Sequence, residues 1–504
     1  MNITQRMQIG ASLMLLAKFL ERGLGLISTV ILARLLLPGD FGLVAMAAPI
    51  VMFIELLRSF SFDMALIQKA DAEAAHFDTA WTLNLLCTTL IALLMVLAAA
   101  PAAAFYQEPR FAPVMAWLAL GTFIQGFENI GTVNFRKELD FGQEFRLMLY
   151  KKLASITLTA LLAWWLRNYW ALVWGTLASR VFGVLLSYHM SHYRPSLRLS
   201  HWRDLMHFSK WMVVNNLLFF LNLRGVDFVI ARLFGAAVLG QYLVAIEIST
   251  ILSVELVAAA NRAFFPGFVK LSGEPNTVVR HCTTVMAAAA MWLLPLAMLL
   301  YLLGDLFVHA MFGDKWPLTG ELIGEFGLFG ALTAFTGSLS YAYMAVGHPR
   351  FSSVAAGVQS LIVLGLLVLN GYWGRPQWIG HCFVLTACLV LFVHAAMVKH
   401  VFPALQLLRW LRGVARMSLA AAGAGLVISS LKAPLLGSGL PEPVVLVGLG
   451  IGGVALYGAG VWLLWQLDHC KDGPERSILT RIPRLQAYIE RRRSPYDWIA
   501  EGRI

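Results

Sequence analysis

The sequence predicts an all-α polytopic membrane protein with about fourteen transmembrane helices, and three observations support this. Of the 504 residues, 59% are hydrophobic and 13% are charged, with a mean hydropathy of +0.70; an average soluble protein has roughly 25% charged residues. A membrane-spanning helix needs about 20 mostly apolar residues, and fourteen such segments fit between Gly10 and Leu467. The third observation is a motif that occurs twice.

The duplicated motif reads ARLLLPGDFGLV at residues 33–44 and ARLFGAAVLGQY at residues 231–242. Each copy lies at the end of a long apolar segment, and the offset of 198 residues pairs Gly42 with Gly240. Six predicted spans precede the second copy, so both halves have the same orientation and are related by an axis along the membrane normal. Duplicated helical bundles with a site between the halves are common in secondary transporters.

The repeat divides the chain into four parts. We expect an N-terminal lobe of helices 1–6 in residues 1–200 and a C-terminal lobe of helices 7–12 in residues 201–405. An extra helix pair follows in residues 406–470, and a basic cytoplasmic tail in residues 471–504. The tail is either an amphipathic helix on an anionic leaflet or a solvated basic segment.

The distribution of basic residues predicts that both termini are cytoplasmic. With the N-terminus inside, nineteen Lys and Arg residues fall in cytoplasmic segments and seven on the opposite side, before the tail is counted. This asymmetry follows the positive-inside rule. It also accounts for the net charge of +11 without a nucleic-acid partner. The first apolar segment continues into the motif without a cleavage site, so we expect it to remain in the protein.

The chain lacks the sequence marks of an enzyme. It has no Walker sequence, no metal-ligand cluster and no nucleophile with a recognisable base. Its five cysteines have no metal-like spacing and predict buried thiols without a disulfide framework. These observations favour movement of a substrate over bond breaking.

Ionisable residues inside predicted spans mark a candidate site. Each costs about 2.5 to 3.5 kcal/mol on the insertion scale, so such residues normally face a cavity or a partner. Lys18, Glu21 and Arg22 share one face of the first helix at i, i+3, i+4 spacing. Further ionisable residues and three asparagines lie in other predicted spans, and together they predict a water-filled, cation-rich cavity between the halves. The whole set is Lys18, Glu21, Arg22, Glu55, Arg58, Arg180, Arg224, Asp227, Asn215, Asn216 and Asn222.

A cavity of this composition suits an anionic head group. Cations held near carboxylates lose less hydration than isolated charges, and the planar fork of arginine binds phosphate oxygens bidentately. The opposing interpretation is that Glu55 and Arg58, at i, i+3 spacing, form structural ion pairs with each other or with the charges of the first helix. Lys151 and Lys152, near a cytoplasmic helix end, are interpreted as snorkelling residues.

Acidic residues of the second half are candidates for ion coupling. Asp227, Glu247 and Glu255 are placed to bind a coupling proton or sodium ion, and no other cofactor is expected. Asp227 follows Arg224 at i, i+3 spacing, so a structural ion pair between these two residues is an equally good interpretation.

Several segments resemble one family of membrane proteins. They are GLGLISTVILARLLLPGDFGLVAM at 23–46, ALIQK at 65–69, FRKELDF at 135–141, IARLFGAAVLGQY at 230–242, RAFFPGFVKL at 262–271 and FGDKW at 312–316. In order and placement, over roughly residues 8–420, they resemble the Wzx-type polysaccharide flippases of the multidrug/oligosaccharidyl-lipid/polysaccharide exporter superfamily, most closely the colanic acid exporter branch.

The resemblance implies two six-helix lobes around a central cavity, with an extra helix pair that helps form a groove for a polyprenyl tail. It implies a bacterial inner-membrane transporter that turns undecaprenyl-diphosphate-linked oligosaccharide to the periplasmic leaflet, by alternating access driven by an ion gradient. The product would serve exopolysaccharide or lipopolysaccharide biosynthesis, with polysaccharide polymerase machinery as a further partner. By that likeness the substrate contacts are Lys18, Arg22, Arg58, Arg180 and Arg224.

Two alternatives are open at this point. A multidrug exporter of the same superfamily would share the lobes, but usually has twelve helices and an acid-dominated cation site. A membrane glycosyltransferase or polymerase acting on the same lipid would be an enzyme, commonly with a large extracytoplasmic loop, whereas the predicted outer connectors are short.

Overall fold

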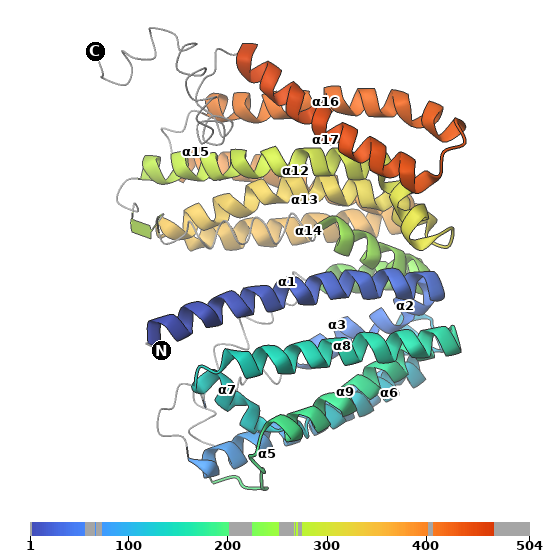
Figure 1. Ribbon diagram of the computed structural model, residues 1–504, viewed down its shortest axis with the longest axis vertical. Coiled ribbons are helices and arrows are strands. Elements are labelled where there is room, and N and C mark those ends of the chain that lie inside the picture. The colour runs from blue at the N-terminus through green and yellow to red at the C-terminus, as the bar shows by residue number, and fades with distance from the viewer. Residues whose placement is uncertain are drawn as a thin grey trace. The chain divides into compact units, whose positions relative to one another are not determined.

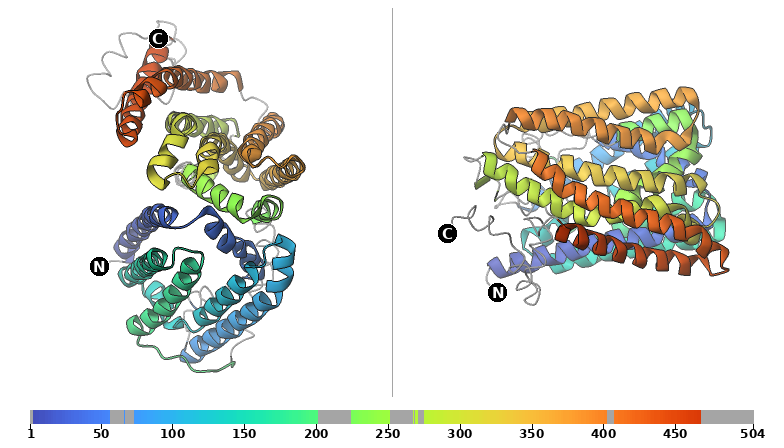
Figure 2. Two further views of the ribbon diagram at one scale, coloured as in Figure 1. Left: turned by 90° about the vertical axis from the view of Figure 1, so that its right-hand side faces the viewer. Right: turned by 90° about the horizontal axis from the view of Figure 1, so that it is seen from above.

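The computed structural model describes residues 3–55, 66, 73–200, 224–250, 267, 269–270, 275–401 and 407–467. These residues are almost entirely helical, and none of them forms a strand, so the predicted all-α fold is confirmed. Contacts between Cα atoms divide the chain into two compact units, Met1–Leu243 (unit 1) and Val244–Ile504 (unit 2). Each unit is a bundle of roughly parallel helices (Figures 1 and 2).

Unit 1 is built from long antiparallel helices joined by short connectors. Its elements are α1 (Ile3–Leu35), α2 (Pro38–Ala45), α3 (Ala47–Glu55), α5 (Ala74–Tyr106), α6 (Phe111–Gln125), η2 (Ile130–Thr132), α7 (Val133–Lys137), α8 (Phe141–Leu166) and α9 (Trp170–Met190). A further helix, Arg224–Thr250, crosses the boundary between the units. Helix α8 packs between α1 and α9, and α6 packs between α5 and α9.

One end of unit 1 holds the first copy of the motif, and we call it the motif end. Here α1 ends and α2 begins, and the turns at 107–110 and 167–169 lie at the same end. The Asp40 carboxylate accepts hydrogen bonds from the backbone N–H of Leu37, at 2.9 Å, and of Tyr169, at 3.0 Å. Tyr106 donates to the carbonyl of Met46 at 3.3 Å. These bonds fix the motif to the neighbouring turns.

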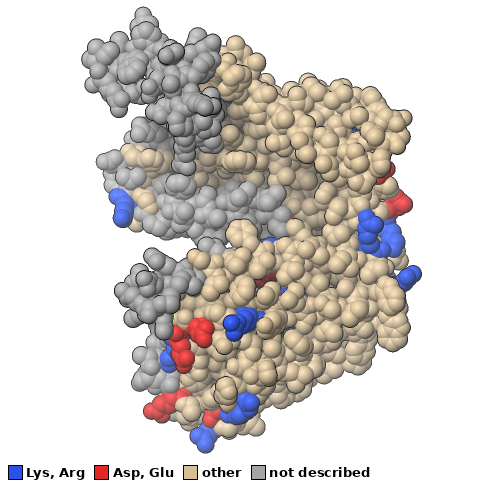
Figure 3. Space-filling model, in the orientation of Figure 1, with Lys and Arg blue, Asp and Glu red and all other residues tan. Residues whose placement is uncertain are grey.

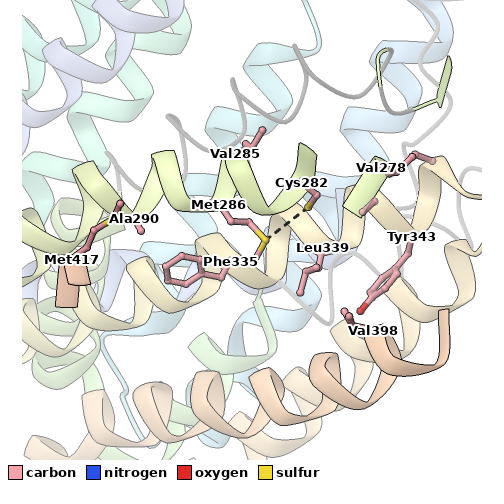
Figure 4. Packing of buried hydrophobic residues seen from close by; sticks show 12 residues of the cluster. Val278, Cys282, Val285, Met286, Ala290, Phe335, Leu339, Tyr343, Val398 and Met417 are labelled. Atoms are coloured by element: carbon pink, nitrogen blue, oxygen red, sulfur yellow. Dashed lines mark hydrogen bonds between the residues drawn. The ribbon is translucent and has the colours of Figure 1, made fainter. Parts of the chain in front are cut away.

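Unit 2 has a core formed by several helices. Its elements are α12 (Pro275–Phe312), α13 (Pro317–Ala345), α14 (Pro349–Trp373), η3 (Pro376–Trp378), α15 (Ile379–Val401), α16 (Leu407–Gly437) and α17 (Glu442–Leu467). Figure 4 shows Cys282 and Met286 of α12, Phe335 and Tyr343 of α13 and Val398 of α15 in one buried cluster. Proline occupies the first turn of α13 and α14, where its missing N–H leaves no hydrogen bond unmade.

The helices α16 and α17 form a hairpin that packs against α12. Their contact includes a buried apolar cluster and two polar attachments. Lys432 Nζ contacts Asp305 Oδ1 at 2.7 Å, and His309 Nδ1 contacts Glu442 Oε2 at 2.5 Å. The hairpin corresponds to the extra helix pair expected from the sequence.

The helices are long enough and apolar enough for a multi-pass membrane protein. In the described part of the chain, ten helices meet both criteria, and two shorter apolar helices, Pro38–Ile54 and Phe111–Gln125, accompany them. Charged side chains on the face drawn in Figure 3 lie mainly toward the ends of the helices. The number fourteen stays a prediction, because several predicted spans fall partly outside the described residues.

The predicted domain boundaries follow the sequence repeat and stay predictions, whereas the contact boundary falls between Leu243 and Val244. The second motif copy therefore belongs to unit 1 by its contacts. The predicted tail at 471–504, together with Cys470, lies outside the described residues. The cysteines at 87, 282, 382 and 388 are free thiols.

Candidate functional site

A cavity of about 410 Å³ lies inside unit 1, among α1, α8, α9 and the end of α6. Five ionisable side chains line it: Glu21 of α1, Glu128 of the connector after α6, Lys151 and Lys152 of α8, and Arg180 of α9. The remaining lining is mostly apolar and includes Leu20, Leu24, Phe145, Met148 and Leu149. The cavity thus combines a charged part with an apolar wall.

The cations of the cavity are held in place by neighbouring groups. Lys151 forms an ion pair with Glu128. Its aliphatic stem lies against Gly183, because a Cβ on that glycine would be 3.4 Å from Lys151 Cε. Arg180 donates from Nη1 to the Thr122 hydroxyl at 2.9 Å. A guanidinium and an ammonium positioned in this way are partly desolvated before a ligand arrives, which lowers the cost of binding an anion.

Lys152 brings a third positive charge to the helix α1 side of the cavity. Its Nζ lies 3.7 Å from the position that a Cβ on Gly25 would occupy, so the ammonium is close to the backbone of α1. Three cations and two carboxylates line the cavity, a formal charge of 3 − 2 = +1. An anionic group in the cavity is attracted by all three cations.

The structure brings together part of the residue set predicted from the sequence. Glu21 and Arg180 line the cavity. Lys18 and Arg22 are exposed on α1 and are absent from the cavity lining. Arg58 and Glu255, and the side chain of Glu55, lie outside the described residues.

Arg224 and Asp227 form a separate ion pair in unit 1, away from the cavity lining. Arg224 Nη1 contacts Asp227 Oδ2 at 2.9 Å, and the Asp227 side chain is only 5% exposed. This geometry is that of the structural pair which the i, i+3 spacing suggested. The third acidic candidate, Glu247, is exposed and belongs to unit 2.

Sequence reasoning missed three residues of the cavity: Glu128, Lys151 and Lys152. From the sequence, the two lysines are interpreted as snorkelling because the apolar segment that predicts this span begins only near residue 145, which puts them close to its cytoplasmic end. In the structure α8 begins at Phe141, capped by Asp140, whose carboxylate accepts from the N–H of Gln143 at 3.2 Å. Lys151 therefore lies about 15 Å along the helix from its start. The capping aspartate was the sequence signal for this earlier start.

The two copies of the duplicated motif pack directly against each other inside unit 1. A Cβ on Gly42 would collide with the carbonyl oxygen of Ala236, and a Cβ on Gly240 would collide with the carbonyl oxygen of Pro38. The repeat pairs Pro38 with Ala236 and Gly42 with Gly240, so the contact is reciprocal. Self-complementary contact of this kind marks a local two-fold axis.

At the opposite end of unit 1, the chain after α9 is attached to the start of α5. Asp78 accepts from the Ser196 N–H at 2.9 Å, from the Ser196 hydroxyl at 2.6 Å and from the Tyr193 hydroxyl at 2.5 Å. Burial, with the hydrogen bond to Asp78, raises the pKa of Tyr193, so its hydroxyl stays a donor. Asn129 adds a bond to the Tyr193 carbonyl at 2.7 Å.

Fold and cavity together define a class of protein: a multi-helix membrane protein with a cation-lined cavity within its helical bundle. The fold resembles that of the lipid II flippase MurJ in an inward closed conformation, with a TM-score of 0.67 and 12% identity over 90% of this chain and 98% of the flippase. The chain belongs to the polysaccharide biosynthesis protein family, whose model matches residues 31–319.

Curated relatives agree with this family. The chain is 23% identical to the lipopolysaccharide biosynthesis protein WzxC of Escherichia coli K12 over 63% of this chain and 65% of the relative. It is 24% identical to the succinoglycan biosynthesis transport protein ExoT of Rhizobium meliloti strain 1021 over 60% and 62% of the two chains. The matches thus span somewhat less than two thirds of the relatives' length. They agree with the expectation of a transporter and not an enzyme.

Proposed function

We propose that the chain flips undecaprenyl-diphosphate-linked oligosaccharide repeat units from the cytoplasmic to the periplasmic leaflet of a bacterial inner membrane, for exopolysaccharide or lipopolysaccharide biosynthesis. The observation that carries the proposal is the cavity of unit 1, where Lys151, Lys152 and Arg180 line a partly open space beside an apolar wall. A diphosphate needs several cations at once, and arginine binds its oxygens bidentately.

The position of the cavity fits this direction of transport. The excess of basic residues predicts that both termini are cytoplasmic, and with that orientation the motif end of unit 1 would face the periplasm. The cavity lies near the middle of α1 and α9, along residues 17–24 and 179–183, and extends to Gln125 and Glu128 at the end of α6 away from the motif end. A head group made in the cytoplasm would then enter the cavity from the side on which it is made.

Movement of the substrate requires that the cavity be closed on one side at a time. The packed glycines of the motif copies supply a close contact at the motif end, which suits a periplasmic closure. We propose alternating access, driven by a proton or sodium gradient, with the lipid tail in the membrane and polymerase machinery receiving the flipped unit.

Deletion of the gene tests the proposal in cells. Surface polysaccharide should be lost while lipid-linked repeat units with complete sugars accumulate in the inner leaflet, measured by lipid extraction and mass spectrometry. Incomplete sugars would indicate a glycosyltransferase, and normal export in a strain without a substitute flippase would refute the proposal. Unchanged export with new sensitivity to cationic drugs would favour the multidrug exporter.

A further inference from the structure

Unit 2 contains a buried carboxyl group that no part of the cavity uses. Glu325 lies on α13, eight residues after its start at Pro317 and so about 12 Å along the helix. Its side chain is 13% exposed, and Oε1 lies 2.8 Å from Nδ1 of His381 on α15. The other carboxyl oxygen, Oε2, is buried and has no hydrogen-bond partner.

Close packing of α13 on α15 creates the space for this carboxyl. The Glu325 carboxyl group lies directly over Gly380, where an added Cβ would collide with Oε2. The group is therefore at the first turn of α15, whose N-terminal dipole favours a negative charge. The contact with the His381 side chain accounts for Oε1 and leaves Oε2 unexplained.

An ionised Glu325 would hold negative charge on a buried oxygen without a donor. Loss of hydration without a replacement hydrogen bond costs about 1 to 3 kcal/mol for a polar group, and more for a charged one. A proton on the carboxyl removes that penalty. The imidazole of His381, 70% exposed, is the group through which a proton can pass between water and Glu325.

The surrounding ionisable groups do not neutralise Glu325. Glu321 is exposed one turn earlier on α13, and Cys382 follows His381 on α15. From α12, Tyr301 packs near Gly324, and Asp305 is paired with Lys432. At the same end, Arg375 stacks on Trp378 before α15, and Tyr372 is exposed at the end of α14. His309, near the end of α12, is paired with Asp314 and Glu442.

We propose that Glu325 and His381 form a proton-binding pair that couples the transporter to a proton gradient. The inference rests on the proposed transport function and names the site of its coupling. Protonation of Glu325 neutralises the buried carboxyl. Loss of that proton leaves a negative charge, which α13 and α15 accommodate only by moving apart or by admitting water. The pair lies at the end of unit 2 where α13 and α15 begin, which the predicted topology places near the periplasm, the acidic side of an energised inner membrane.

The test compares Glu325→Gln with Glu321→Gln. Glutamine keeps the shape and the hydrogen-bond acceptor of Glu325, so a purely capping role survives the change. Glu321→Gln removes a carboxylate one turn away on an exposed position of the same helix. A second variant, Gly380→Ala, displaces the carboxyl by its Cβ without removing it. Gel filtration and thermal melting confirm that each variant folds.

Two measurements read out the proposal. Infrared spectra of the protein in nanodiscs should show a protonated-carboxyl band in the wild type and in Glu321→Gln that is absent from Glu325→Gln. In proteoliposomes, flipping of undecaprenyl-diphosphate-linked oligosaccharide extracted from the deletion strain should accelerate when a proton gradient is imposed. That acceleration should be lost in Glu325→Gln, reduced in Gly380→Ala and retained in Glu321→Gln.

Each outcome decides between the ideas. Gradient-dependent acceleration in Glu325→Gln equal to that of the wild type overturns the proton site and leaves the flippase function standing. An equal loss of acceleration in Glu321→Gln also overturns the proton site, because the effect would then come from surface charge. Acceleration by a sodium gradient alone overturns it as well. A wild type that flips nothing refutes the transport proposal, and the infrared band then decides the protonation of Glu325 by itself.

Discussion

At the scale of single residues, the positions of the ion pairs separate structural charges from available ones. Arg224 and Asp227 satisfy each other at 2.9 Å with Asp227 almost fully buried, and they do not line the cavity. Lys151 and Arg180 are also held by neighbours, but they line an open volume that a ligand can enter. The cavity cations differ from the Arg224–Asp227 pair mainly in their accessibility to a ligand, and less in their charge.

The Arg224–Asp227 pair should behave as a structural element. Asp227→Asn leaves Arg224, whose side chain is 33% exposed, without its counter-charge. The cost is therefore lower than the about 3 to 5 kcal/mol that follows removal of one partner of a fully buried pair. We expect a marked fall in melting temperature in detergent for this variant. The double variant Arg224→Leu, Asp227→Leu should recover most of the loss, because two apolar residues replace two charges. A stable double variant that no longer responds to an ion gradient would instead assign coupling to Asp227.

The cavity arginine should contribute directly to ligand affinity. Arg180→Ala removes a charged donor from the cavity, and hydrogen bonds to charged groups contribute about 1.5 to 3 kcal/mol. Binding of undecaprenyl diphosphate, measured by native mass spectrometry, should weaken by about tenfold to a hundredfold. Arg146→Ala is the matched control, because Arg146 is exposed on α8 and absent from the cavity lining. Equal weakening in both variants would mean that general surface charge binds the lipid.

At the scale of elements, the duplicated motif repeats an irregular backbone position as well as a sequence. Leu37, between α1 and α2, is extended with φ −95° and ψ 154°. Gly235, its partner at the 198-residue offset, has φ +81°, a conformation that glycine adopts without the penalty other residues incur. Both copies therefore redirect the chain at the same position, which brings Gly42 and Gly240 onto opposing carbonyls.

Larger residues at these glycines should separate the motif copies. Gly240→Leu places a side chain where the Pro38 carbonyl lies, and overpacking of this kind costs about 1 to 3 kcal/mol. The distance between spin labels at positions 34 and 232, measured by pulsed electron resonance, should increase. Gly39→Leu is the control, because a Cβ at Gly39 has no heavy atom within 4 Å. An unchanged distance in Gly240→Leu would show that the contact does not hold the copies together.

Periodicity and caps predict the elements of this fold well where one local signal governs each helix end. The helical content, the hairpin α16–α17 and the helix break in the motif all follow from apolar length and from Pro and Gly positions. Apolar length predicts one span over residues 111–133, and it does not reveal that the helix there ends at Gln125. There Asn129 caps a separate 3₁₀ turn by accepting from the N–H of Gly131 at 2.9 Å.

The site was less predictable than the helices, because it depends on which helix faces meet. Glu21 and Arg180 are 159 residues apart in the sequence and share a cavity only through the packing of α1 and α9 around α8. No sequence pattern marks Glu325 as a functional residue either. Its importance comes from the packing of α13 on Gly380, which no spacing in the sequence encodes.

At the scale of the whole molecule, the two units differ in chemistry. Unit 1 holds the cation-lined cavity and the packed motif, and unit 2 holds the Glu325–His381 pair and the hairpin α16–α17. Substrate recognition and proton binding would then reside in different units. A transporter divided in this way works only if a change in one unit alters access in the other, which is a coupling free energy between two sites.

Thiol labelling should reveal that coupling. A single cysteine at Ser179, which lines the cavity, should react with a membrane-impermeant maleimide from the cytoplasmic side in an otherwise cysteine-free chain. In Gly240→Leu, reaction from the cytoplasm should slow and reaction from the periplasm should appear, because opening of the motif end favours the alternative state. A bias of about 1.4 kcal/mol changes the ratio of states tenfold, well within the expected overpacking penalty. Cytoplasmic labelling could instead be equally fast in Gly240→Leu and in Gly39→Leu. The motif contact and the cavity would then open independently, and alternating access through this contact would be wrong.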